Sequence, residues 1–287
     1  MYSGSYFKTV GELISPTVFL FLVFSLFFLT NSKSPLASKF CIPLARFHQV
    51  YDIQYMKRQI PNVITCLNLF SGCIGISLAF NGQLIDAGYA IIAAAIFDFF
   101  DGLAARLLNV SSPMGKELDS LADMVSFGLL PSVIIYVMLH ESPALMFGDE
   151  WLKYIAFLIT IFSALRLAKF NLDTRQTTIF IGLPTPACAL FILGLPHIAM
   201  SPSLLVSAYI QNPVILIILT LALSFLLVAE IPLMSLKFTD FGLKNNAYRY
   251  LLLLCSLVLI LLWQFSAIPL IVILYIVLSA VQFSQLK

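Results

Sequence analysis

Between two apolar runs, residues 98–123 read DFFDGLAARLLNVSSPMGKELDSLAD. This stretch holds four aspartates and an arginine, although charged residues make up only 10% of the whole chain. An ordinary soluble domain carries about 25% charged residues. Ionisable groups are costly beside a hydrocarbon environment, so a dense group of them next to apolar segments indicates a functional site.

The composition around this stretch decides the fold class. Hydrophobic residues make up 60% of the 287-residue chain, and the mean hydropathy is +0.98. A soluble globule needs more charge on its surface, and a disordered chain is far less apolar. We therefore predict an all-α, polytopic membrane protein. The five cysteines and three histidines show no redox or metal-ligand spacing, so we assign them no role.

Eight apolar runs are each close to the roughly 20 residues that cross the hydrocarbon as a helix. We predict about eight transmembrane helices, over 60–80, 84–108, 118–140, 151–170, 184–200, 213–236, 250–264 and 268–283. With this count, the lysines and arginines from Lys57 onward fall on one side of the membrane, with Lys153 as the exception. The positive-inside rule makes that side cytoplasmic and places residues 98–123 at its boundary.

The predicted organisation has three parts. Residues 1–55 fit the pattern of spans poorly, and the motif Met56-Lys57-Arg58-Gln59 is typical of a natural amino terminus. We expect 1–55 to be a dispensable extension; the alternative is an additional helix or a targeting segment. Residues 56–200 form the core that holds the aspartates, and 201–287 add carboxy-terminal helices to the same membrane domain.

The aspartates are spaced in pairs that share a helix face. Asp98 and Asp101 are three residues apart, and Asp119 and Asp123 are four apart. The connection between them is short, so the two helices are expected to be antiparallel neighbours whose aspartate faces meet. Small residues on these faces leave room for close approach and for a ligand: Gly102, Ala105 and Gly115.

Four converging carboxylates repel one another, by roughly 4 kcal/mol for a pair about 4 Å apart at an effective dielectric near 20. Hard divalent cations with oxygen ligands, Mg²⁺ or Mn²⁺, relieve that repulsion. Two such ions would form a clamp suited to phosphoryl displacement. The structural alternative, in which Asp101-Gly102 ends a helix and Asp119 begins one, explains only part of the cluster.

The pattern D-x2-D-G-x2-A-R-x8-G-x3-D-x3-D resembles that of the CDP-alcohol phosphatidyltransferases, and this chain fills every position. Flanking segments at 60–68, 117–128, 164–171 and 182–186 resemble the phosphatidylserine synthase branch, the CDP-diacylglycerol–serine O-phosphatidyltransferases. The resemblance covers about residues 56–189. It implies an enzyme that moves a phosphatidyl group from CDP-diacylglycerol to L-serine, releasing CMP and using two Mg²⁺ or Mn²⁺ ions. It also implies a homodimer.

The resemblance further implies roles for individual residues. Asp98, Asp101 and Asp119 would hold the metals, and Asp123 would be both a metal ligand and the general base. The residues implied to bind CDP-diacylglycerol lie on and between the first three helices: Asn62, Thr65, Asn68, Gly102, Ala105, Arg106, Ser112 and Gly115.

The acceptor site is predicted at the end of the fourth span. Arg166, Lys169 and Asn171 lie there, and Arg166 and Lys169 share a helix face. One of them could bind the carboxylate of serine. In the alternative interpretation, these side chains reach out to lipid headgroups.

Two further functions stay open. The first is the same chemistry with glycerol 3-phosphate or inositol phosphate as acceptor, which would demand more basic residues. The second is a transporter or channel with the aspartates as its ion site, although transporter sites usually lie near the membrane midplane. The predicted setting is an integral protein of a bacterial inner membrane, with its site on the cytoplasmic side and no nucleic-acid partner.

Overall fold

The structure is a computed structural model, and it describes residues 45–142, 150–172, 180–200, 209–234, 242 and 246–284. The chain divides into two compact units, Met1–Asp52 and Ile53–Lys287, and the aspartate stretch belongs to the second. Most of the predicted extension 1–55 lies outside the described residues, as do Arg175, Lys237, Lys244 and Lys287 of the predicted basic side.

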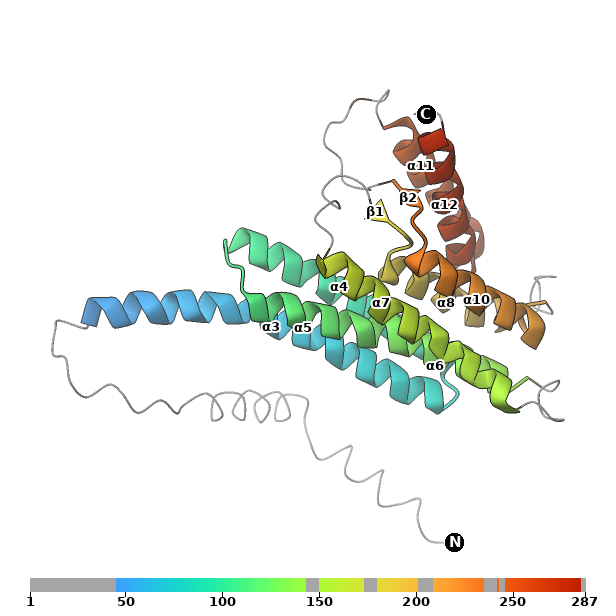
Figure 1. The fold of residues 1–287 in the computed structure, drawn as a ribbon, viewed down its shortest axis with the longest axis horizontal. Helices are drawn as coiled ribbons and strands as arrows, with labels where there is room; N and C mark the ends of the chain where they lie inside the picture. Colours follow the sequence, from blue (N-terminus) through green and yellow to red (C-terminus); the bar gives the residue numbers. More distant parts are fainter. Residues whose placement is uncertain are drawn as a thin grey trace, which may run out of the picture. The chain divides into compact units, whose positions relative to one another are not determined.

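The described residues are almost entirely helical, which confirms the all-α prediction (Figure 1). The first half contains α3 (Ala45–Phe80), α4 (Leu84–Leu107), α5 (Pro113–Asp123), the π-helix η1 (Met124–Leu129) and α6 (Leu130–His140). The second half contains the 3₁₀ helix η3 (Glu150–Phe157), α7 (Leu158–Leu172), α8 (Thr185–Met200), α10 (Pro213–Val228), α11 (Ala247–Trp263), the 3₁₀ helix η4 (Gln264–Ala267) and α12 (Ile268–Ser284).

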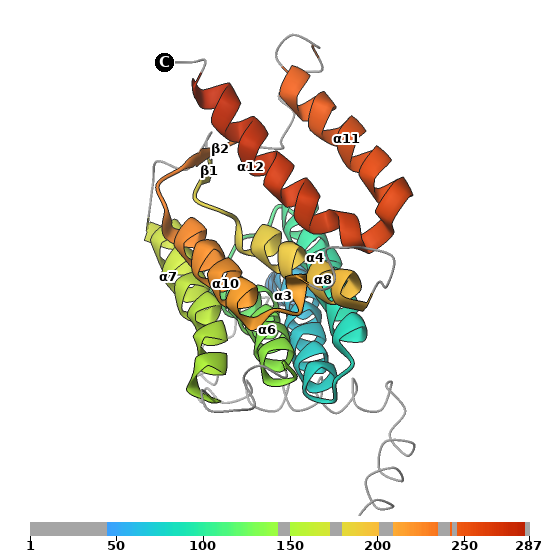
Figure 2. The same ribbon diagram turned by 90° about the vertical axis from the view of Figure 1, so that its right-hand side faces the viewer.

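Four helical segments of the described chain are long and apolar enough to cross a membrane: Gln59–Phe80, Pro113–His140, Trp151–Leu172 and Ala247–Ser284. The last of these contains two helices, α11 and α12, because the backbone breaks at Gln264 with a φ of 50° (Figure 2). Two shorter apolar helices, α8 and α10, join them. These segments confirm a polytopic α-helical membrane protein, while the count of eight spans stays a prediction.

The sixth predicted span, 213–236, is longer than the helix that forms there. Helix α10 ends at Val228, and Pro232–Leu233 continues as the short strand β2, paired antiparallel with β1 (Phe180–Ile181). Pro232 disfavours helical geometry at the residue before it. The Ile231 carbonyl instead accepts a hydrogen bond of 2.9 Å from the backbone N–H of Gly182.

The helices of this unit pack through small residues. The buried core lies where α4, α6 and α8 meet, around Ile91, Ile134 and Leu193. Helix α8 approaches α12 so closely that a Cβ atom at Gly194 would lie 2.3 Å from Cδ of Pro269. Such backbone proximity is typical of helix association in lipid, where packing replaces the hydrophobic effect.

We predict that Gly194→Ala destabilises the protein, because the added methyl group overpacks the α8–α12 contact and such overpacking costs about 1–3 kcal/mol. The measurement is the apparent Tm of the detergent-solubilised protein. Gly102→Ala is the matched control for stability, because a Cβ atom there meets nothing within 4 Å. Equal Tm values for the two variants would contradict the close contact.

Candidate active site

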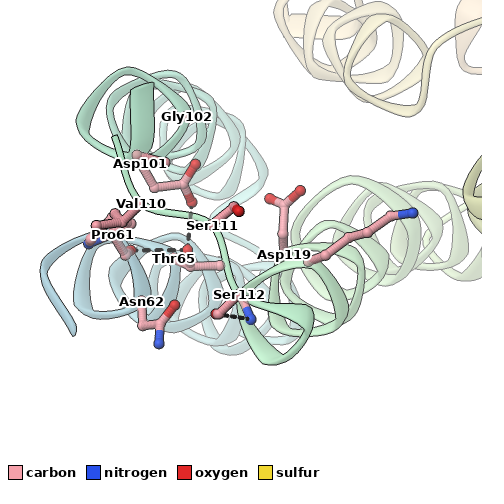
Figure 3. A pocket seen from close by; sticks show the side chains of 12 residues that line it. Pro61, Asn62, Thr65, Asp101, Gly102, Val110, Ser111, Ser112 and Asp119 are labelled. Atoms are coloured by element: carbon pink, nitrogen blue, oxygen red, sulfur yellow. Dashed lines mark hydrogen bonds between the residues drawn. The ribbon is translucent and has the colours of Figure 1, made fainter. Parts of the chain in front are cut away.

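The connection between α4 and α5 is short and well defined by its sequence. Asn109 adopts a left-handed conformation with φ of 55° just after α4. Ser112 then caps α5 by accepting a hydrogen bond of 2.9 Å from the backbone N–H of Gly115, and Pro113 occupies the first turn. Residues 112 and 113 therefore define the start of α5. As a result, Asp101 of α4 and Asp119 of α5 face a common space (Figure 3).

Three of the four aspartates form a compact group at the facing ends of α4 and α5. One carboxylate oxygen each from Asp98, Asp119 and Asp123 lies within 4.8 Å of the others, and all three side chains are partly buried. In the part of the chain that the structure describes, no lysine or arginine forms an ion pair with them. Three oxygen ligands without a basic partner fit a hard divalent cation.

Asp101 lies beside this group and is fixed by α3. Its carboxylate accepts a hydrogen bond of 2.7 Å from the hydroxyl of Thr65, which also lies 3.0 Å from the carbonyl oxygen of Pro61. Both side chains are buried, with 6% of Asp101 and 3% of Thr65 exposed. Helix α3 therefore orients the fourth carboxylate.

A cavity of about 270 Å³ opens next to the carboxylates (Figure 3). Asp101 and Asp119 form part of its wall. Six of the eight residues predicted to bind the donor also line it: Asn62, Thr65, Gly102, Ala105, Ser112 and Gly115. Because Gly102 lacks a side chain, the space above it stays open. The arrangement can hold a polar ligand against the carboxylate group.

The two other predicted donor residues lie outside the cavity lining. Arg106 is exposed, and its Nε donates a hydrogen bond of 3.0 Å to the carbonyl oxygen of Gly102 one turn earlier. Asn68 is fully buried and donates from Nδ2 to Oδ1 of Asp123 at 3.3 Å. Asn68 therefore contacts the carboxylate group directly, and its predicted contact with the donor stays a prediction.

Lys116 also lines the cavity, although its sequence position indicated only membrane sidedness. Its Nζ lies 3.4 Å from the carbonyl oxygen of Asn171 at the end of α7. The sequence signal that could have placed Lys116 at the cavity is its spacing. It lies three residues before Asp119, so the two side chains share a face of α5.

The three predicted acceptor residues are separated in the structure. Arg166 is turned inward, with 8% of it exposed and its guanidinium 5.9 Å from the ring centroid of Phe170. Lys169 is turned outward, and its Nζ lies 3.9 Å from the carboxylate of Glu230. Asn171 donates from Nδ2 to the hydroxyl of Ser120 on α5 at 2.8 Å. Only Arg166 lies within electrostatic reach of Asp123.

Helix η1 fixes the last carboxylate between α3 and α7. Ser126 of η1 donates a hydrogen bond of 3.0 Å to the backbone oxygen of Asn68. On its other side, a Cβ atom at Gly128 would lie only 3.0 Å from Cβ of Ser163 on α7. Single π-helical turns of this kind occur frequently at functional sites. Here the π-turn begins directly after Asp123 and sets its direction.

Comparison with known proteins agrees with this geometry. Residues 58–236 match the family model described as CDP-alcohol phosphatidyltransferase. A Bacillus subtilis protein named CDP-diacylglycerol–serine O-phosphatidyltransferase is 35% identical over 173 residues, which cover 60% of this chain and 88% of that protein. A Helicobacter pylori protein of the same name is 39% identical over 46% of this chain and 55% of its own length. A Methanocaldococcus jannaschii protein, also of that name, is 30% identical over 68% of this chain and 81% of its own.

We predict that the carboxylate group binds a divalent cation. Titration of the purified protein with Mn²⁺, followed by the electron paramagnetic resonance signal of free Mn²⁺, should show saturable binding. Asp119→Asn should weaken it at least about tenfold, since loss of even an outer-shell partner costs about 10–100-fold. Asp86→Asn, an exposed aspartate at the other end of α4, is the matched control. Equal Mn²⁺ affinity in both variants would exclude the site.

Proposed function

Because this chain belongs to the CDP-alcohol phosphatidyltransferase family, we propose that it transfers the phosphatidyl group of CDP-diacylglycerol to the hydroxyl of L-serine, giving phosphatidylserine and CMP. The observation that carries the proposal is the position of Asp119, which belongs to the carboxylate group and also lines the adjoining cavity. A donor held in that cavity would present its phosphates to the carboxylate group. The names of the similar proteins supply serine as the acceptor.

The residues proposed to hold the cations are the four aspartates. Asp98, Asp119 and Asp123 offer neighbouring oxygens, and Asp101 adds a fourth carboxylate from the same face of α4. We propose two ions, Mg²⁺ or Mn²⁺, as the oxygen-only ligand set favours. When bound, they would neutralise the negative charge of the pyrophosphate.

Asp123 is proposed as the general base. Its Oδ1 accepts a hydrogen bond from Asn68, which orients the carboxylate. A serine hydroxyl is a weak nucleophile until a positioned base removes that proton. Its oxygen then forms a bond to the phosphorus that carries diacylglycerol, the bond from that phosphorus to the CMP oxygen breaks, and CMP leaves.

The cavity is proposed to hold the cytidine diphosphate part of the donor. Asn62 and Ser112 supply polar groups to its wall, and Lys116 adds a positive charge suited to phosphate oxygens. Arg106 lies on the exposed side of α4. We propose that it meets the donor from outside the cavity, where the family resemblance assigns it a nucleotide contact.

Arg166 is proposed to bind the carboxylate of serine. Its guanidinium is buried, and its Nε has no hydrogen-bond partner among the described residues. A planar guanidinium matches a carboxylate well. Lys169 and Asn171, which contact Glu230 and Ser120, are proposed to shape the end of α7 beside this site.

The setting of the reaction is also a proposal. The chain is an integral membrane protein, and we propose a bacterial inner membrane with the site on its cytoplasmic face, as the distribution of basic residues favours. We propose residues 56–200 as the catalytic core, 201–287 as further helices of the same domain and 1–55 as a dispensable extension. The family resemblance supports a homodimer.

The activity has a direct test. Purified protein with CDP-diacylglycerol, Mn²⁺ or Mg²⁺ and labelled serine should form labelled phosphatidylserine and an equal amount of CMP. Glycerol 3-phosphate in place of serine should give little product. Product with glycerol 3-phosphate but none with serine would keep the family chemistry and overturn serine as the acceptor.

The Asp123→Asn variant tests the proposed base. We expect turnover to fall about 10²–10⁴-fold, because a neutral amide does not accept the hydroxyl proton. Binding of CDP should change much less, because Asp123 does not line the cavity. Wild-type turnover in this variant would remove Asp123 as the base.

A further inference from the structure

Asn68 has an amide group whose orientation is fixed. The residue is fully buried on α3, its backbone oxygen accepts from Ser126, and its Nδ2 donates to Asp123. The hydrogen bond of 3.3 Å from Nδ2 to Oδ1 of Asp123 places the amide nitrogen toward Asp123. The amide oxygen, Oδ1, therefore lies on the other edge of the side chain.

This oxygen is left without a partner. Among the described residues, Oδ1 of Asn68 accepts no hydrogen bond, although the side chain is completely buried. An unpaired buried polar atom is costly, and buried amides are normally satisfied. A buried acceptor beside a proposed general base is therefore available to a donor on a substrate.

Arg166 on α7 presents the complementary case. It is a buried charged donor whose Nε is also unpartnered, and it lies within electrostatic reach of Asp123. The two residues come from α3 and α7, the helices that flank η1 through Ser126 and Gly128. Asp123 thus has an unpaired acceptor on one neighbouring helix and an unpaired cation on the other.

An α-amino acid with a hydroxyl group matches these three features. Its carboxylate needs a cation, its ammonium needs an acceptor, and its hydroxyl needs a base. We infer that Oδ1 of Asn68 accepts a hydrogen bond from the ammonium group of the acceptor, so that Asn68 and Arg166 together select a zwitterionic amino acid. This inference rests on the proposed function and adds the residue that recognises the amino group.

The assignment makes Asn68 a specificity residue as well as a positioning residue. 3-Hydroxypropanoate keeps the hydroxyl and carboxylate of serine but lacks the ammonium, so it would leave Oδ1 unpaired. 2-Aminoethanol lacks the carboxylate and would leave Arg166 unpaired. Sites that hydrogen-bond a substrate group discriminate strongly against analogues that lack it.

The test compares these acceptors in wild type and Asn68→Leu, a substitution of similar size without polar atoms. The readout is kcat/KM for each acceptor, or the inhibition constant where an analogue gives no product. We expect the variant to lose about tenfold or more of the preference for serine over 3-hydroxypropanoate, as expected when one hydrogen bond of about 1.4 kcal/mol is removed. The KM for CDP-diacylglycerol should stay within about twofold, because Asn68 does not line the cavity.

Asn62→Leu is the matched control, since it is the same substitution on the same helix but in the cavity wall. It should raise the KM for CDP-diacylglycerol and keep the preference for serine. If Asn68→Leu instead lowers kcat equally for every acceptor and keeps the preference, Asn68 only positions Asp123 and the inference is overturned.

A second variant covers the case in which Asn68→Leu is misfolded. Asn68→Asp keeps an oxygen acceptor at this position. Equilibrium dialysis of this variant with labelled serine in the presence of CDP, with unlabelled 3-hydroxypropanoate as competitor, should show a lower dissociation constant for serine than for 3-hydroxypropanoate. Loss of that preference would overturn the inference. Failure of the proposed function is distinct, because the wild-type protein would then form no phosphatidylserine before any variant is compared.

Discussion

Mutual repulsion among partly buried carboxylates is the constraint on which this structure depends. One carboxylate oxygen each from Asp98, Asp119 and Asp123 lies within 4.8 Å of the others, and no basic side chain of the described residues forms an ion pair with them. Such a group is tolerable only with protons or cations between its oxygens. The surrounding contacts hold the carboxylates in place: the Ser112 cap sets the start of α5, and Thr65 holds Asp101.

The π-turn after Asp123 connects this constraint to the rest of the membrane bundle. A regular helix from 113 to 140 would rotate Asp119 and Asp123 relative to the apolar residues that follow, because each turn type advances the side chains by a different angle. The π-turn lets the carboxylates face α4 while Ser126 contacts α3 and Gly128 contacts α7. The segment can then hold the carboxylates at the site while the residues that follow are buried among the other helices.

The sequence anticipated which residues lie together locally, because that follows from helical spacing. Asp98, Asp119 and Asp123 are close in the structure, and most residues predicted to bind the donor lie along one cavity, while their roles stay predictions. Contacts between helices that are distant in the sequence could not be predicted in the same way. Arg166 and Lys169 share a nominal face, yet one is buried and the other reaches Glu230, because α7 emerges from the bundle between them. Neither the π-turn nor the Asn68 contact has a signal in a single sequence.

We propose that the carboxylate group holds divalent cations beside the donor cavity, and the proposed reaction depends on these ions. An anomalous difference map from crystals of the protein grown with Mn²⁺ and CDP would locate these ions. We expect a strong anomalous peak among the carboxylates of Asp98, Asp119 and Asp123, with the diphosphate of CDP next to it in the cavity. A map with no peak at these carboxylates, or with CDP bound elsewhere, would contradict it.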